Sequence, residues 1–410
     1  MIFPGRSHFG PFFLAVVWAV VGRFLTLATM KYSISNGNSL AIAYYGLLLN
    51  FIVFITYLGS VGLASTWSVV GFRVGVKFRK PLLRVSILAV GIVAWVINFY
   101  LPDFIGLNSF GYGQVPVVVL IFCVIAYQYT LVVAAESLVA GRNWLYNVFS
   151  ILPSVTLAIG ILVFSDSQNV SSTVLVWVAA WLFLCAVFEI SSLYTDANIP
   201  QKHKPDFSAK EITSSVILVF IGSLLCQYVL YASNLMLSKS QGGVFLATFV
   251  IFQQIRQAII FIPSSISNVL AKRLVDKRND ITYSRNLLRV QYIAAGSVAS
   301  MVFLFFAFYK IWEWESNISS ALSLWRMILY ACFTASASLI FINNFFSRLS
   351  QAKNMFGYNF IFDVSYALPA LCILFFATGT DSLNIAIGAL ILGVFSQAVC
   401  MHVFKRRLFR

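Results

Sequence analysis

A short polar stretch interrupts one of the most apolar parts of this sequence. Residues 252–265, FQQIRQAIIFIPSS, place an arginine, three glutamines and a proline inside an apolar run that extends from Val244 to Leu270. Charged and amide side chains are expensive in hydrocarbon, so in a membrane-spanning segment they face a water-filled cavity, a partner or a ligand. The stretch is therefore a candidate binding site.

The spacing of these polar residues suits one face of a helix. On a helix that turns 100° per residue, Gln253, Arg256 and Gln257 form one polar stripe, and the apolar residues between them point elsewhere. Pro263 follows two turns later, removes a backbone hydrogen-bond donor and predicts a bend that acts as a hinge. The pattern indicates a kinked helix that lines a cavity.

A second cation is expected at the same depth. Arg23 lies about twelve residues into its own apolar run, as Arg256 does, so both guanidinium groups should lie near the middle of a membrane. Lys31, about 12 Å further along the first helix, would extend the cationic face outward. Asn50 and Asn234 are expected to line the same space. These residues define a candidate cationic chamber.

A cationic chamber calls for an anionic ligand. The planar guanidinium group binds phosphate oxygens through two parallel hydrogen bonds, and a diphosphate can bridge two such groups. Amide side chains can bind sugar hydroxyls. The alternative is structural, with Arg256 paired to a carboxylate such as Glu189 or Asp363 as a fixed strut. Both carboxylates lie nearer the inner ends of their predicted spans, which favours the ligand interpretation.

Composition identifies the environment of these residues. Of 410 residues, 60% are hydrophobic and only 10% are charged, whereas soluble domains carry about 25% charged residues. Runs of about 20 apolar residues are long enough to cross a bilayer as helices, and they lack the alternation of an outer-membrane barrel. We predict an all-α polytopic membrane protein with about 12 transmembrane helices, near residues 11–33, 41–63, 82–101, 115–137, 144–164, 172–194, 212–234, 244–268, 288–309, 322–347, 359–378 and 383–404.

One polar linker, residues 194–211, divides the chain into two sets of six predicted helices. The predicted lobes are residues 1–200 and 201–410. Because six is an even number, both lobes enter the membrane in the same direction, as in parallel repeats. This is the plan of a two-lobe transporter.

The charge distribution sets the expected orientation. The chain has 28 Lys and Arg against 13 Asp and Glu, and most basic residues fall in loops on the side of the N-terminus. The positive-inside rule then predicts that both termini are cytoplasmic, and it explains the net charge without a nucleic-acid partner. Six cysteines and three histidines show no metal-ligand spacing, and no phosphate-binding loop is present. We therefore predict no cofactor, no metal site and no enzymatic activity.

Three segments resemble a known superfamily. They are AYYGLLLNFIVFITYLGSVGLASTWSVVGFR (43–73), GVFLATFVIFQQIRQAIIFIPSSISNVLAKRL (243–274) and QAKNMFGYNFIFDVSYALP (351–369). The pattern resembles the multidrug/oligosaccharidyl-lipid/polysaccharide exporter (MOP) superfamily, and within it the bacterial polysaccharide flippases of the Wzx type. The resemblance implies a MATE-like fold of two lobes that work by alternating access. It also implies a central chamber lined by the first, second, seventh and eighth helices, in which Arg23 and Arg256 match interior basic residues and Lys31 is a weaker match.

The expected function follows from this resemblance. A Wzx-type flippase moves an undecaprenyl-diphosphate-linked oligosaccharide, the O-antigen or another surface polysaccharide unit, from the cytoplasmic to the periplasmic leaflet of the bacterial inner membrane. Its expected partners are the lipid-linked substrate, the bilayer, and a glycan polymerase with its chain-length machinery. One alternative is an ion-coupled drug/cation exporter of the same superfamily, which should carry deep acidic residues. A membrane glycan polymerase or ligase is a further alternative, disfavoured by the short predicted outer loops.

Overall fold

A computed structural model describes most of the chain. It covers residues 9–60, 76–100, 116–139, 149, 155–162, 174, 177–181, 209–239, 244–277, 280–309, 324–353, 355–377 and 381–409. The longer helices are α1 (Phe9–Ser35), α2 (Ser39–Gly59), α4 (Val76–Tyr100), α5 (Val117–Val139), α8 (Ala209–Lys239), α9 (Val244–Asp276), α10 (Ile281–Tyr309), α11 (Leu324–Ala335), α12 (Ala337–Ala352), α13 (Phe356–Phe376) and α14 (Ser382–Leu408). All regular elements in this part of the chain are helical, which confirms the predicted all-α class.

Ten of the predicted spans coincide with described helices. Six segments are long and apolar enough to cross a membrane by themselves: Ser39–Gly59, Val117–Ala134, Val216–Lys239, Ile328–Ala352, Phe356–Phe376 and Ser382–Leu408. The predicted spans near 144–164 and 172–194 fall largely outside the described residues, as does most of the predicted linker. The molecule is a polytopic membrane protein, while the count of twelve and the two lobes stay predictions.

The predicted span 322–347 is two helices, α11 and α12, which meet at a turn at Ser336. Hydroxyl groups around the turn bind backbone carbonyls of the preceding helical turn: Thr334 Oγ1 donates to Tyr330 O at 2.8 Å, and Ser336 Oγ donates to Phe333 O at 2.6 Å. Such bonds compete with the helical ladder and bend helices. A hydropathy pattern could not show this break, because the residues on both sides are apolar.

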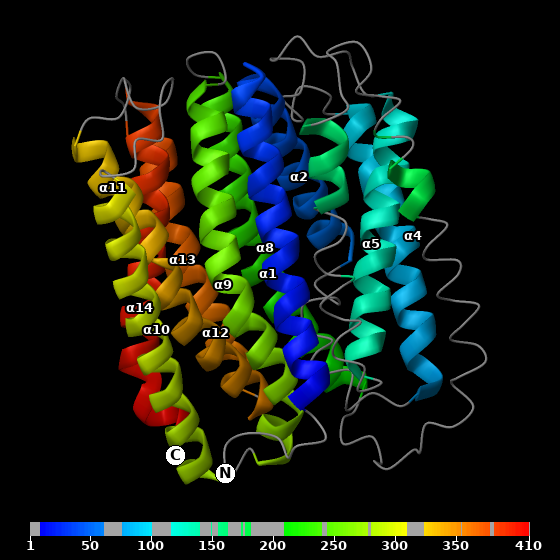
Figure 1. Cartoon of the computed structure of the whole chain (residues 1–410). Coiled ribbons are helices and arrows are strands. Elements are labelled where there is room, and N and C mark those ends of the chain that lie inside the picture. The colour runs from blue at the N-terminus through cyan, green and yellow to red at the C-terminus, as the bar shows by residue number, and fades with distance from the viewer. Residues whose placement is uncertain are drawn as a thin grey trace.

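The two halves of the chain meet along four helices (Figure 1). From the first half, α1 packs against α9, and α2 packs against both α8 and α9. Within the halves, α4 and α5 pack against each other and against α2, while α13 lies against α8 and α14. We call the contact of α1 and α2 with α8 and α9 the seam. It is formed by the first, second, seventh and eighth predicted spans.

The seam is tightly packed, and α2 is its central helix. In α2, 78% of the apolar window is buried inside the molecule, too much for a helix that mainly faces lipid. Phe54 stacks on Tyr231 of α8 with ring centroids 5.3 Å apart. Gly46 faces Val250 of α9 so closely that an added Cβ would lie 2.9 Å from Val250 Cγ1. Glycine is needed here because the backbone of α2 approaches a side chain of α9.

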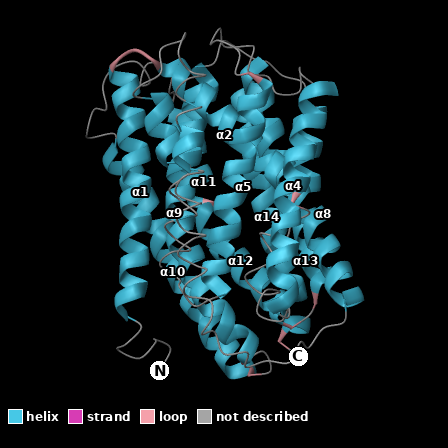
Figure 2. Ribbon diagram, turned by 90° about the vertical axis from the view of Figure 1, so that its right-hand side faces the viewer, coloured by secondary structure: helices cyan, strands magenta, loops and turns pink. Residues whose placement is uncertain are grey.

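The helix axes are roughly aligned, and successive helices such as α1 and α2 run in opposite directions between the two ends of the bundle, as the view turned by 90° also shows (Figure 2). We call the end where α1 ends and α2 begins the Ser35 end, and the opposite end the Phe9 end. The last turn of α14 lies at the Phe9 end, the same end at which α1 starts (Figure 1). This arrangement places both ends of the described chain on one side of the bundle.

Candidate functional site

Arg23 of α1 reaches across the seam to α9. Its Nη1 donates one hydrogen bond to Gln254 Oε1 at 3.1 Å and another to Gln257 Oε1 at 3.3 Å. A hydrogen bond from a charged donor is roughly twice as strong as a neutral one, so these bonds are a substantial link between the two halves. Both acceptors are neutral amide oxygens.

A further amide pair links α9 to α2. Gln253 Nε2 lies 3.4 Å from Asn50 Oδ1 and donates to it. Asn50 is held by its own helix, because its Nδ2 donates to Gly46 O at 2.7 Å. The polar residues of α9 thus contact α1 and α2 together, and the sequence QQIRQ is the centre of a polar layer in the seam.

Arg256 is also buried, but its side chain points toward α11 and not toward α1 or α2. Its side chain is 5% exposed, and its guanidinium carbon lies 4.7 Å from the centroid of the Phe333 ring on α11. The face of an aromatic ring attracts a cation, which compensates part of the burial. Within the described part of the chain, Arg256 has no ion pair and its Nε has no hydrogen-bond partner. The Nε donor of this buried guanidinium group is therefore unsatisfied in the described structure.

The two arginines lie at one level of α9. Arg23 contacts Gln254 and Gln257, which flank Arg256 in the chain. Each arginine is twelve residues, about 18 Å, from the Ser35 end of its helix. The helical turn directs Arg256 about 100° away from Gln257, so the cations approach from different sides of α9. The two arginines therefore lie at the common depth that the sequence predicts. The amide side chains of Gln254 and Gln257 lie on the side of α9 that Arg23 contacts.

The remaining predicted residues lie further from this layer. Lys31 is exposed, two turns of α1 closer to the Ser35 end. Asn234 is fully buried on α8, where its Nδ2 donates to Leu230 O at 2.7 Å and its Oδ1 has no hydrogen bond. Helix α9 continues through residue 263, while the side chain of Pro263 lies outside the described residues. The layer therefore brings together Arg23, Asn50, Gln253 and Gln257, with Arg256 beside them.

Two members of the site were not predicted. Gln254 belongs to the same short motif, but it points about 100° away from Gln253, and only the position of α1 makes it the acceptor for Arg23. Phe333 carries no polar signal in the sequence, and it reaches Arg256 because α11 packs against α9. Both omissions concern contacts between helices, which the pattern of one helix cannot show.

Asp363 does not form the strut that the structural alternative requires. This buried residue of α13 faces α8, where a Cβ added at Gly222 would lie 2.6 Å from Asp363 Oδ2. No ion pair joins Asp363 to Arg256. Glu189, the other candidate, lies outside the described residues. In the described ranges, no group of three His, Cys, Asp or Glu side chains is placed to hold a metal ion.

The fold of this chain is similar to that of several solved structures. No family model matches the sequence, and no curated protein matches it. Among solved structures, the MATE multidrug transporter DinF-BH in complex with R6G superposes with a TM-score of 0.65 at 15% identity, over 98% of this chain and 94% of that one. The chain has a MATE-like fold.

Two further MATE structures support this assignment. A MATE in the straight conformation gives a TM-score of 0.61 at 14% identity, covering 97% of this chain and 95% of that chain. An inward-facing multidrug resistance MATE family transporter of the MOP superfamily gives 0.57 at 15% identity, covering 94% of both chains. The MATE-like fold therefore accounts for nearly the whole length of the molecule, including all four helices of the seam.

Proposed function

We propose that this protein is a transporter that flips a lipid-linked oligosaccharide by binding its diphosphate in the seam. The observation that carries the proposal is the burial of Arg256 in the membrane-spanning region without an ion pair to any described carboxylate. An isolated buried charge is costly, by roughly 2.5 to 3.5 kcal/mol on insertion scales, and is retained where function requires it. An anionic substrate would satisfy this charge.

The chemistry of the layer suits a phosphorylated glycan. A phosphate oxygen can replace a neutral amide oxygen as the acceptor for Arg23. The new hydrogen bond would be stronger, because both its donor and its acceptor are charged. Gln254 and Gln257 would then be released to bind sugar hydroxyls. Arg256 offers a second guanidinium group at the same level, and a diphosphate has enough oxygens to engage both.

The seam also suggests how the substrate would cross. Alternating access requires α1 and α2 to separate from α8 and α9 at one end and then at the other. Near the Ser35 end, Gly46 against Val250 is the contact that must part to release the glycan, whereas Phe54 against Tyr231 lies deeper along α2. The acyl tail could stay in lipid throughout. We place the protein in the bacterial inner membrane with cytoplasmic termini, two six-helix lobes, and a glycan polymerase as a functional partner.

A drug/cation exporter is the second candidate. The DinF-BH structure is titled a multidrug transporter in complex with R6G, and its fold is shared here. The observation that favours this candidate is Asp363, a buried carboxylate seven residues, about 10 Å, into α13. A cationic cargo would need such a group, whereas a diphosphate would not.

Reconstituted vesicles separate the two candidates. The wild type, Arg256→Ala, Arg256→Lys and Asp363→Asn would be compared for flipping of a fluorescent undecaprenyl-diphosphate oligosaccharide and for uptake of a lipophilic cation. The proposal expects glycan flipping to fall at least about tenfold in Arg256→Ala, since one buried charged contact is worth about 1.5 to 3 kcal/mol. Arg256→Lys should recover only part of the activity, because lysine lacks the planar fork. Cation uptake that depends on Asp363, without glycan flipping, would establish the second candidate instead.

A further inference from the structure

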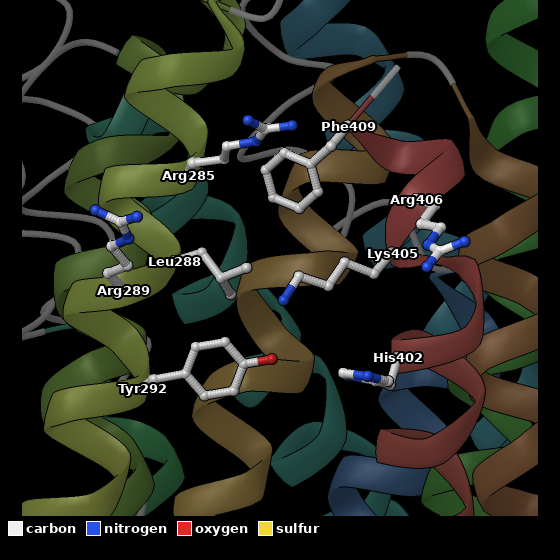
Figure 3. Close-up of a pocket in the computed structure, with 8 residues that line it drawn as sticks. All are labelled: Arg285, Leu288, Arg289, Tyr292, His402, Lys405, Arg406 and Phe409. Atoms are coloured by element: carbon white, nitrogen blue, oxygen red, sulfur yellow. The ribbon is translucent and has the colours of Figure 1, made fainter.

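A cavity of about 670 Å³ lies between α10 and α14, away from the seam. It occurs at the Phe9 end, where α10 begins and α14 ends (Figure 3). Both helices pack against α12, which passes behind the cavity. No helix of the seam contributes a described lining residue. The cavity is therefore structurally independent of the proposed transport site.

The cavity is strongly cationic. Arg285 and Arg289 line it from α10, and Lys405 and Arg406 line it from α14, with His402 one turn earlier on α14. No acidic side chain occurs among its described lining residues. Figure 3 shows Lys405 extending from α14 toward α10, and its Nζ lies 5.4 Å from the centroid of the Tyr292 ring. Lys405 and Arg406 suit the negative end of the α14 dipole, but that dipole does not account for the two arginines of α10 on the other side of the opening.

The floor of the cavity and its surroundings are apolar. Leu288 and Phe409 belong to a buried hydrophobic cluster, in which Phe409 meets the Phe346 ring edge-on at 6.4 Å. Next to the lining residues in the chain, Ile293 of α10 is 70% exposed and Val403 of α14 is 69% exposed. A soluble surface would not be expected to present such groups, but lipid chains would cover them. The cations thus lie directly next to an outward-facing hydrocarbon surface.

We propose that this cavity binds the phosphate headgroup of an anionic membrane lipid, with the acyl chains along the exposed faces of α10 and α14. Phosphate is the chemistry that several arginine and lysine side chains recognise together. Free phosphate would use the cations alone, whereas a lipid uses both the cations and the apolar faces around Ile293 and Val403. Basic pockets between membrane helices on the cytoplasmic side bind lipid headgroups by the same principle.

The test uses the full-length protein purified in detergent, with dioctanoyl phosphatidylglycerol as the probe and bound lipid counted by native mass spectrometry. The double variant Arg289→Gln/Lys405→Gln removes two cavity charges. The control Arg84→Gln/Arg407→Gln removes two exposed charges that do not line the cavity. We expect the affinity for the probe to fall at least about tenfold in the first variant and less than about twofold in the control. Arg289→Lys/Lys405→Arg, which keeps both charges, should bind within about threefold of the wild type.

Three outcomes would overturn the proposal. Equal affinity in the wild type and the Arg289→Gln/Lys405→Gln variant would show that the cavity does not bind the headgroup. Equal binding of dioctanoyl phosphatidylcholine, whose phosphate is offset by the choline cation, would show that the cavity does not select anionic lipids. Displacement of the probe by inorganic phosphate at an equal concentration would identify a free-phosphate site. None of these results depends on transport, so the proposed function is tested separately.

Discussion

Arg23 Nη1 and Gln254 Oε1 lie 3.1 Å apart, although 231 positions separate the two residues in the chain. This bond joins the first helix to the eighth predicted span, across the contact between the two halves of the molecule. It places a charged donor on an uncharged acceptor inside the apolar bundle. The seam is therefore held together by a polar bond that an anion could replace, and this property connects its packing to the proposed transport.

The Arg23–Gln254 bond should contribute measurably to the stability of the seam. We expect a double-mutant cycle of Arg23→Met and Gln254→Leu to give a coupling free energy of about 1 to 2 kcal/mol. This coupling free energy lies between the average for hydrogen bonds between membrane helices and the value for hydrogen bonds to charged groups. The measurement is the free energy of unfolding in mixed detergent micelles. The cycle of Arg23→Met with Gln227→Leu, a half-buried glutamine of α8 that no described bond links to Arg23, should show no coupling. A coupling near zero for Gln254 would mean that the bond does not persist.

The ring of Phe333 should stabilise the buried charge of Arg256. Phe333→Leu keeps an apolar side chain but removes the aromatic face, and a desolvated cation–π contact is worth about 2 kcal/mol. Phe345→Leu is the matched control, because Phe345 is equally buried and has one aromatic neighbour, Phe346, but no cation over its ring in the described structure. We expect the thermal midpoint in detergent to fall further for Phe333→Leu than for Phe345→Leu.

A second substitution pair checks this interpretation. In an Arg256→Met background the charge is absent, so Phe333→Leu and Phe345→Leu should then lower the thermal midpoint by similar amounts. If the difference between them persisted without Arg256, the ring would act through packing against Phe249, whose centroid lies 5.8 Å away, and not through the cation.

The membrane class and most helices could be predicted because each depends on local composition. A run such as residues 383–404 is predominantly apolar and has no acidic residue, lysine or arginine, and the structure has one continuous helix there. The depth of Arg23 and Arg256 was also predictable, because position along a helix follows from residue number alone. The turn at Ser336 was not, since the hydroxyl bonds that form it are made by serines and threonines that occur equally in straight helices.

Contacts between helices were the weakest part of the sequence-based prediction. Gln254 was omitted from the site because one polar stripe on one helix was assumed to face one space. In the structure, the polar face of α9 is wide and contacts α1, α2 and the interior of its own half. Helix rotation and neighbour identity depend on packing of the entire bundle, and no local pattern encodes them.

Close packing at Gly46 should be essential for the closed seam. In Gly46→Ala the new methyl group would overlap Val250, and overpacking of this kind costs about 1 to 3 kcal/mol. We expect a lower thermal midpoint for Gly46→Ala and recovery in Gly46→Ala/Val250→Ala, which creates the missing space. Gly296→Ala on α10 is the control, because no atom lies within 4 Å of its added Cβ. It should be neutral or slightly stabilising, since alanine favours helix over glycine by about 1 kcal/mol.

Membrane potential should drive the proposed transport. Moving two negative charges outward across an inside-negative membrane is favourable by roughly 4 to 5 kcal/mol per 100 mV, provided that Arg23 and Arg256 do not move through the field. We therefore expect the initial rate of outward flipping in vesicles to rise as an inside-negative potassium diffusion potential is increased, and to fall when its sign is reversed. A monophosphate-linked analogue carries about half the charge and should show about half the logarithmic voltage dependence. Identical voltage responses for the two substrates would mean that other charges carry the coupling, and no response to voltage in either would remove the potential as the driving force.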